Sequence, residues 1–299
     1  MTTISERMNR WLFQLTVKGM LDTPPVARGN QTFAALSMVH QRDVLPYMLA
    51  IKTFAFYARP ERIILVADPS LDANDQALLS RHVPGIEIVK AESFRRPALP
   101  VGGTWERLSA ISVLCAETSI VQLDADTVTF DKPTEVVDAA VAGRSFVIRS
   151  EASVEIVPLD AAAAEGKRLL ATSNHVQVAA EARMTELQDL SRYRYVRGCS
   201  GFTGFGRGAL SPQLLDMVSH QMRGIHGARW DEWGTEQVTS NLLAASAPRA
   251  FLLPHPRYCN ADSLAPSTVV SHYIGYARYT SRDYETRAAK AAAILAAAR

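Results

Sequence analysis

Two aspartates with one residue between them follow an apolar run in the first half of the chain. Asp124 and Asp126 lie in the stretch IVQLDADTVTF, which spans residues 120–130. Because side chains two positions apart in an extended segment point to the same side, the pair can chelate a divalent cation. Carboxylate oxygens suit Mg²⁺ or Mn²⁺, and a metal held in this way can bridge a diphosphate.

Two other interpretations of this stretch compete with a metal site. DADTV also fits the D-x-D-x-T/V pattern of haloacid-dehalogenase-like phosphatases, in which Asp124 would be the nucleophile and Asp126 a general acid. That pattern follows the first strand of its fold and needs a later lysine and acidic pair, whereas three predicted strands come first here. Lys167 is not directly followed by such a pair, and Asp231 and Glu232 lie further on in a tryptophan-rich stretch. The remaining interpretation is a solvated turn whose carboxylates cap the next residues.

The elements around the pair alternate between strand-like and helix-like segments. Strands are predicted at 32–40, 61–70, 86–92 and 120–123, and helices at 43–57, 72–83 and 105–117. This order predicts an α/β fold with a central, mainly parallel sheet flanked by helices. Ligands of such sheets bind outside the carboxyl ends of the strands, where residues 37–40, Asp68 and the aspartate pair would lie.

The second half of the chain is less regular. Strands are predicted at 146–148 and 250–254, and helices at 161–190 with a break near 172–174, at 211–224, from about 233–235 and from 283 onward. No linker or repeat interrupts the pattern. We therefore expect one domain over residues 1–299, with a nucleotide-binding half at about 30–130, an acceptor-side half at about 131–280 and a C-terminal helix at 283–299.

Composition excludes several classes of protein. The net charge of +2 gives no strong basic field, so we expect no nucleic-acid partner. Three widely spaced cysteines without a C-x-x-C pair indicate a reducing compartment rather than a disulfide framework. No apolar run approaches the roughly 18 residues of a membrane span. We expect a cytoplasmic protein, with peripheral attachment to a membrane as an alternative; composition indicates no oligomeric state.

The N-terminal segment lacks the apolar core of a signal peptide. Trp11, Leu12, Leu15 and residues 17–19 instead predict one face of a short amphipathic helix.

Four short motifs follow one another along the chain. They are LDADT at 123–127, CSG at 199–201, TEQ at 235–237 and HYIGYAR at 272–278. In this order and spacing, over about residues 32–280, they resemble the nucleotide-sugar glycosyltransferases of the GT-A fold. The closest resemblance is to family 8, to which glycogenin belongs, with its D-x-D, N-S-G, D-Q and H-F-x-G-x-x-K motifs.

The resemblance implies a single GT-A domain that moves a hexose from a nucleoside-diphosphate sugar to an acceptor. UDP as the nucleotide and retention of anomeric configuration come from the resemblance alone, and the acceptor could be a glycan, a lipid or a small molecule. A nucleotide-sugar-binding protein without catalysis remains an alternative.

The metal and diphosphate residues are carried over position by position. Asp124, Asp126 and His272 would hold Mn²⁺ or Mg²⁺, although a histidine in SHYIG taken alone is usually a core or loop residue. Gly275 would let the backbone approach a phosphate, and the cation of Arg278 would clamp it. Arg278 replaces the family's lysine, and the Pro-Trp that follows it in the family is missing.

The remaining positions would contact the rest of the donor. Candidates for donor binding are Ser37, Val39, His40, Arg107, Ala125, Cys199, Ser200 and Gly201, and Glu236 and Gln237 are the catalytic candidates. The first three match the contacts to uracil and ribose, and the CSG triplet lies beside the transferred sugar in the family.

Several of these positions have an alternative role or depart from the family. Cys199 replaces an asparagine and Glu236 an aspartate. Arg107 could instead be a solvated side chain paired with Glu106 or a neighbour. Glu236 could instead be an acid favoured by the helix dipole at a helix start, worth roughly 0.3–1 kcal/mol.

Overall fold

The structure is a computed structural model that describes residues 3–150, 153–275 and 277–298. The described residues divide into two compact units. Unit 1 comprises Met1–Lys90, Gln122–Val137 and Pro254–Arg299, and unit 2 comprises Ala91–Val121 and Asp138–Leu253. The expectation of one domain over residues 1–299 stays a prediction.

Parallel strands connected by helices form the sheet of unit 1. Its elements are β1 (Gln31–Val39), α2 (Val44–Ala58), β2 (Pro60–Ala67), α3 (Ala73–His82) and β3 (Glu87–Lys90). Strand β1 pairs in parallel with β2, and β2 with β3. Helix α2 is apolar and buried on nearly all sides, as expected for an interior helix. Helix α3 begins with a capping box between Asp72 and Asp75. The strands and helices predicted for this half are confirmed within a few residues.

A small second sheet in unit 1 joins distant parts of the chain. It contains β5 (Thr127–Thr129), β11 (Tyr258–Asn260) and β12 (Val270–His272). Strand β12 pairs antiparallel with β5 and parallel with β11, and His272 is opposite Thr127 in the register. No pattern in the sequence indicated these three-residue strands.

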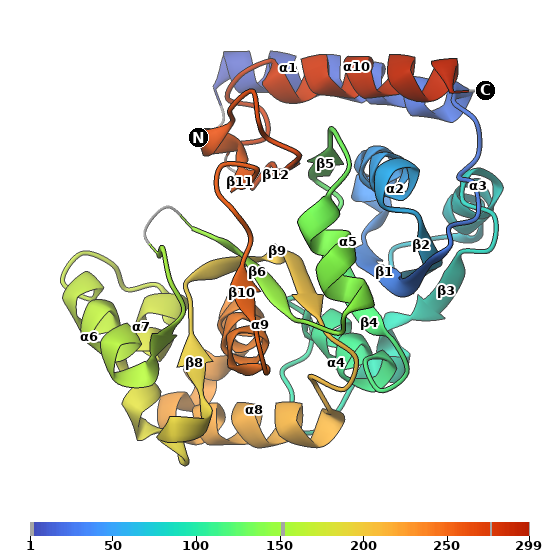
Figure 1. Ribbon diagram of the computed structural model, residues 1–299. Coiled ribbons are helices and arrows are strands. Elements are labelled where there is room, and N and C mark those ends of the chain that lie inside the picture. The colour runs from blue at the N-terminus through green and yellow to red at the C-terminus, as the bar shows by residue number, and fades with distance from the viewer. Residues whose placement is uncertain (1–2, 151–152, 276, 299) are drawn as a thin grey trace. The chain divides into compact units, whose positions relative to one another are not determined.

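The first and last helices of the chain, α1 (Ile4–Val17) and α10 (Asp283–Ala297), lie side by side (Figure 1). The ring of Phe13 stacks on Tyr284 with centroids 4.0 Å apart, and Tyr284 stacks on Tyr273 at 4.2 Å. The predicted C-terminal helix is confirmed. The predicted N-terminal helix also forms, and Val17 of the predicted face is buried. Trp11 of that face is exposed, however, and Phe13 is buried instead.

Unit 2 contains the remaining strands of the main sheet. Strand β6 (Phe146–Arg149) pairs antiparallel with β9 (Gly198–Phe205) and parallel with β10 (Phe251–Leu252). Strand β4 (Ser119–Leu123) begins in unit 2 and ends in unit 1. The seven strands have the order β10-β6-β9-β4-β1-β2-β3. The expected α/β fold with a central, mainly parallel sheet flanked by helices is confirmed.

The other elements of unit 2 are mostly helical. They are α4 (Trp105–Leu114), α6 (Leu159–Leu169), α7 (Val176–Ala182), α8 (Pro212–His226) and α9 (Thr235–Ser246), with the short strands β7 (Val157–Pro158) and β8 (Arg194–Tyr195); α5 (Thr134–Val141) spans both units. The predicted helix at 161–190 is broken as expected but ends at Ala182. No helix among the described residues is long and apolar enough to cross a membrane.

Candidate functional site

The aspartate pair lies in the turn that connects β4 to β5 in unit 1. The backbone oxygen of Asp124 accepts hydrogen bonds from the Thr127 backbone nitrogen at 3.2 Å and from its hydroxyl at 2.9 Å. Because β5 then pairs with β12, His272 is brought to this turn from 146 residues away. One candidate ligand atom from each of Asp124, Asp126 and His272 lies within 4.8 Å of the others.

Both carboxylate oxygens of Asp126 are engaged by cationic or ionisable groups. The Nε2 atom of His272 lies 3.1 Å from Oδ1, and the Nε atom of Arg278 donates to Oδ2 at 2.7 Å. The Nη1 atom of Arg278 also lies 3.4 Å from Oδ1 of Asp43. Burial would raise the pKa of Asp126, but His272 and Arg278 outweigh it and lower the pKa to about 2. Asp126 is therefore ionised over the whole physiological range.

Asp124 is the more accessible member of the cluster. Its side chain is 30% exposed, its Oδ2 lies 3.9 Å from Nε2 of His272, and its Oδ1 accepts a hydrogen bond from Gln122 at 3.3 Å. Two carboxylates and one imidazole are a donor set that fits Mn²⁺ or Mg²⁺. A cation that used Oδ2 of Asp126 would compete with Arg278 for that oxygen.

The residues predicted to contact the nucleotide lie in the same unit, at the carboxyl end of β1. The hydroxyl of Ser37 is buried and donates to the backbone oxygen of Leu123 at 2.7 Å, which ties β1 to β4. Val39 is buried, and His40 is half-exposed with its Nδ1 3.1 Å from Asp68. The nucleotide contacts of these residues stay predictions.

Two further residues that the sequence predicted to bind the donor, Ala125 and Gly275, also lie in unit 1. Ala125, between the two aspartates, is buried. A Cβ added at Gly275 would meet no atom within 4 Å, so the backbone there is open to close approach. Their assignment to donor binding also stays a prediction.

A second polar cluster lies within unit 2 and is centred on Arg107 and Glu236. Both side chains are only 3% exposed, and Nη2 of Arg107 lies 3.2 Å from each oxygen of Glu236. The hydroxyl of Ser200 donates to Glu236 at 3.1 Å, and the hydroxyl of Thr104 donates at 3.0 Å. The alternative of a solvated Arg107 paired with Glu106 is wrong, because Arg107 is buried and its guanidinium lies beside Glu236.

The elements of unit 2 explain how this cluster forms. Arg107 lies in the first turn of α4, Glu236 in the first turn of α9, and Ser200 in the buried strand β9. A buried ion pair of this kind fixes the orientation of the carboxylate. Sequence reasoning missed Thr104, whose backbone is left-handed at φ 73°, immediately before α4.

The remaining predicted residues of unit 2 are chain neighbours of Ser200 and Glu236. The Sγ atom of Cys199 is 3.9 Å from Oε1 of Gln237, and Nε2 of Gln237 donates to the backbone oxygen of Gly198 at 3.4 Å. Gly201 is buried within β9. Together the carboxylate, amide and hydroxyl groups of this cluster offer the donors and acceptors that recognise a ligand rich in hydroxyl groups.

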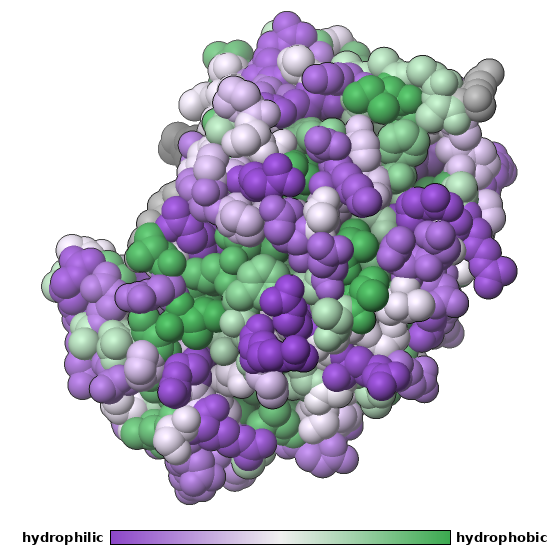
Figure 2. Space-filling model, in the orientation of Figure 1, coloured by the Kyte–Doolittle hydropathy of each residue, from purple (hydrophilic) through white to green (hydrophobic). Residues whose placement is uncertain are grey.

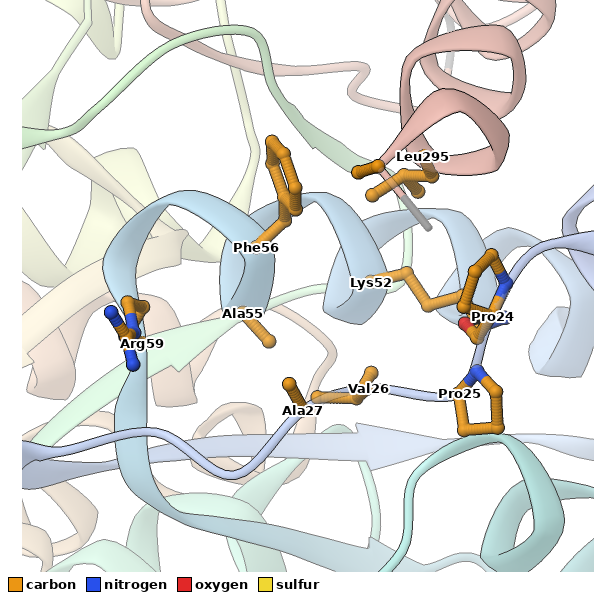
Figure 3. A pocket seen from close by; sticks show the side chains of 10 residues that line it. Pro24, Pro25, Val26, Ala27, Lys52, Ala55, Phe56, Arg59 and Leu295 are labelled. Carbon is orange, nitrogen blue, oxygen red and sulfur yellow. Dashed lines mark hydrogen bonds between the residues drawn. The ribbon is translucent and has the colours of Figure 1, made fainter.

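A cavity of about 350 Å³ lies elsewhere in unit 1 and contains no member of the acidic cluster (Figure 3). It is lined by Pro24, Pro25, Val26, Ala27, Lys52, Ala55, Phe56, Arg59, Leu295 and Ala298. The ammonium of Lys52 donates to the backbone oxygens of Met20, Thr23 and Pro24 at 3.0–3.2 Å. Since these bonds satisfy the ammonium, Lys52 ties α2 to the segment before β1.

Comparison with known proteins supports the fold. No family model and no curated protein matches the sequence. Among solved structures, an active-site mutant of the galactosyltransferase LgtC matches with a TM-score of 0.50 at 12% identity, over 88% of this chain and 96% of that one. The bifunctional glycosyltransferase WbbM matches with a TM-score of 0.51 at 12% identity, over 88% of this chain and 52% of that one.

The chain has the GT-A fold. The predicted fold is thereby confirmed, whereas membership of family 8 stays a prediction. In this chain Asp124 and Asp126 lie in the turn after β4, as the sequence predicted. The sequence did not indicate that Asp43, read as the start of a helix, contacts Arg278 through its carboxylate.

Proposed function

We propose that the protein is a metal-dependent glycosyltransferase that moves a hexose from a nucleoside-diphosphate sugar to an acceptor. The observation that carries this proposal is the convergence of Asp124, Asp126 and His272 at the end of β4 in a chain with the GT-A fold. A glycosyl transfer of this type must stabilise a departing diphosphate, and an aspartate–aspartate–histidine cluster is suited to that task.

The three residues of the cluster would hold Mn²⁺, with Mg²⁺ as the alternative, and the bound ion would neutralise charge on the diphosphate. His272 would serve as a neutral ligand through Nε2. Asp126 is ionised and buried, so it is ready to bind a cation without losing a proton first. Arg278, already at the cluster, offers a planar guanidinium that can bind phosphate oxygens in a bidentate manner.

Within unit 2, we assign recognition of sugar hydroxyls to Glu236 and Gln237. The ion pair with Arg107 orients Glu236 as an acceptor, and Ser200 adds a further hydrogen bond. UDP as the nucleotide, with contacts to Ser37, Val39 and His40, and retention of configuration rest on the resemblance to family 8.

Thermal unfolding with a panel of nucleoside diphosphates and nucleotide sugars, each with and without Mn²⁺, tests the proposal. A ligand at about 100 times its Kd stabilises a protein by about 2.7 kcal/mol, which raises Tm by several degrees. We expect this shift with UDP or a UDP-hexose only when Mn²⁺ is present. It should disappear in Asp126→Asn and persist in Asp131→Asn, a matched change at an exposed aspartate in the same unit.

Turnover separates the proposal from its alternatives. Release of nucleoside diphosphate from a nucleotide sugar is the expected activity, and binding without any such release would indicate a non-catalytic binding protein. Release of inorganic phosphate from phosphate monoesters would indicate a phosphohydrolase. If no nucleoside diphosphate shifts Tm under any condition, the proposal is wrong.

A further inference from the structure

Helix α1 packs against the rest of unit 1 through the side that carries Asn9, Phe13 and Val17. Phe13 is fully buried against Tyr284, and the side-chain amide of Asn9 donates to the backbone oxygen of Tyr279 at 2.9 Å. The fully buried Val17 continues this side toward the C-terminal end of the helix. These contacts fix the rotation of α1 about its axis and determine which residues face outward.

A line of large apolar side chains occupies the opposite side of α1. Ile4 is 85% exposed, Met8 54%, Trp11 58% and Leu15 46%. Their spacing of four, three and four residues places them along one line on the helix surface, which we call the α1 stripe. Scattered exposed apolar residues are normal, but an aligned set of four on one helix indicates an interaction surface.

Cationic side chains border the α1 stripe. Arg7 and Lys18 are exposed and lie about three helical turns apart, and hence on the same edge of the stripe. Neither has a carboxylate partner within 4 Å among residues 3–150, 153–275 and 277–298. Glu6, the acid of this helix, is occupied in the capping box with Thr3 at 2.6 Å.

We propose that α1 binds the surface of an anionic lipid bilayer. The α1 stripe enters the boundary between headgroups and acyl chains, and Arg7 and Lys18 contact lipid phosphates. Trp11, near the middle of the stripe, has the amphipathic ring that is enriched at this boundary. On the face shown in Figure 2, hydrophobic residues also cover the C-terminal half of α10, where Ile294 is 37% exposed.

A second copy of the chain fits the same surface less well. The spacing of the α1 stripe also matches the seam of a coiled coil, in which the next position after Leu15 is Lys18. A helix–helix seam would bury that ammonium without an acidic partner. At a bilayer the same side chain extends along the apolar surface and leaves its charge at the headgroups. The charge of the stripe's edge therefore favours lipid.

Cosedimentation with vesicles tests the proposal on the full chain. We expect binding to vesicles of phosphatidylglycerol and phosphatidylcholine, at least tenfold weaker binding to phosphatidylcholine alone, and weakening by salt. Trp11→Ser with Leu15→Ser, and separately Arg7→Gln with Lys18→Gln, should each reduce binding at least tenfold. Trp233→Ser is the matched control, because this residue of unit 2 is 72% exposed and lies outside the stripe.

Fluorescence reports the position of the helix directly. Of the four tryptophans, Trp105 and Trp230 are buried, so in a Trp233→Phe variant Trp11 is the exposed one. Its emission should shift to the blue on anionic vesicles and be quenched by lipids with brominated acyl chains. Circular dichroism and Tm of every variant establish that the fold is retained.

Three results would overturn the proposal. The first is no binding to anionic vesicles, and the second is equal binding to anionic and neutral vesicles. The third is that the wild type is an oligomer and the Trp11→Ser, Leu15→Ser variant is a monomer, which would assign the stripe to contact with a second copy.

Discussion

Arg278 and a bound divalent cation would compete for the carboxylate of Asp126. Removal of Arg278 should therefore strengthen metal binding rather than weaken it. The guanidinium donates to Oδ2 of Asp126 at 2.7 Å, while His272 lies 3.1 Å from Oδ1. Arg278→Ala leaves Oδ2 without its cation. We expect the variant to bind Mn²⁺ more tightly than the wild type when no nucleotide is present, and to bind UDP more weakly.

The magnitude follows from the geometry of the ion pair. A hydrogen bond to a charged group contributes about 1.5–3 kcal/mol, and the side chain of Arg278 is 24% exposed, so we take the lower part of this range, about 1.5–2 kcal/mol. At about 1.4 kcal/mol for each factor of ten, Mn²⁺ should bind roughly 10- to 30-fold more tightly. Loss of a phosphate-binding cation should weaken UDP by about tenfold.

Isothermal titration calorimetry with Mn²⁺ alone, and with UDP in saturating Mn²⁺, measures both affinities. Arg282→Ala is the matched control, because it removes the same charge from an exposed position where Arg282 pairs with Glu285 at 2.7 Å. Its affinities should equal those of the wild type. If Arg278→Ala binds Mn²⁺ no more tightly than the wild type, Arg278 does not compete with the cation and the reasoning fails.

Two further predictions concern stability. Burial lowers the pKa of His226 to about 4, so between pH 6.5 and 4 the unfolded chain binds more protons and the unfolding free energy should fall, by roughly 1–2 kcal/mol after allowance for partial exposure. His226→Gln should remove this decrease in urea unfolding measured from pH 7 to 4.5; parallel curves for the two proteins would contradict the assignment. A Cβ at Gly204 would lie 2.2 Å from the ring of Phe146, so Gly204→Ala should lower the unfolding free energy by about 1–3 kcal/mol. Gly224→Ala, in α8 with nothing within 4 Å, should raise it by up to about 1 kcal/mol, and equal effects of the two changes would refute the packing argument.

Local patterns determined much of the first half of the chain. Apolar runs closed by polar residues predicted β1, β2 and β4, and Asp72 marked the start of α3. The strand signals and the cap at Asp72 depend on neighbours in the sequence, through side-chain periodicity and helix capping, and can therefore be recognised without the fold. The position of the aspartate pair directly after β4 follows from the same local signals.

The glycine-dense segment shows where local patterns fail. Residues 198–205 form the buried strand β9, although they lack the alternation that marks a strand. A Cβ at Gly198 would lie 2.3 Å from Val147, so glycine is required there by close packing against β6. Only the partner strand explains this choice of residue, and the partner is fifty residues away in the chain.

The candidate site itself depends on contacts between distant residues. The motif order suggested His272 as a ligand, but the pairing of β12 with β5 places it beside Asp126. The sequence allowed Arg107 to be a solvated side chain, and only the structure shows that Glu236 of α9 is its buried partner. The sequence of α1 likewise determined an amphipathic helix, while packing against the ring of Tyr284 in α10 determined that Phe13 is buried and Trp11 is exposed. In each case one residue type is compatible with several environments, and the free energy of long-range packing selects among them.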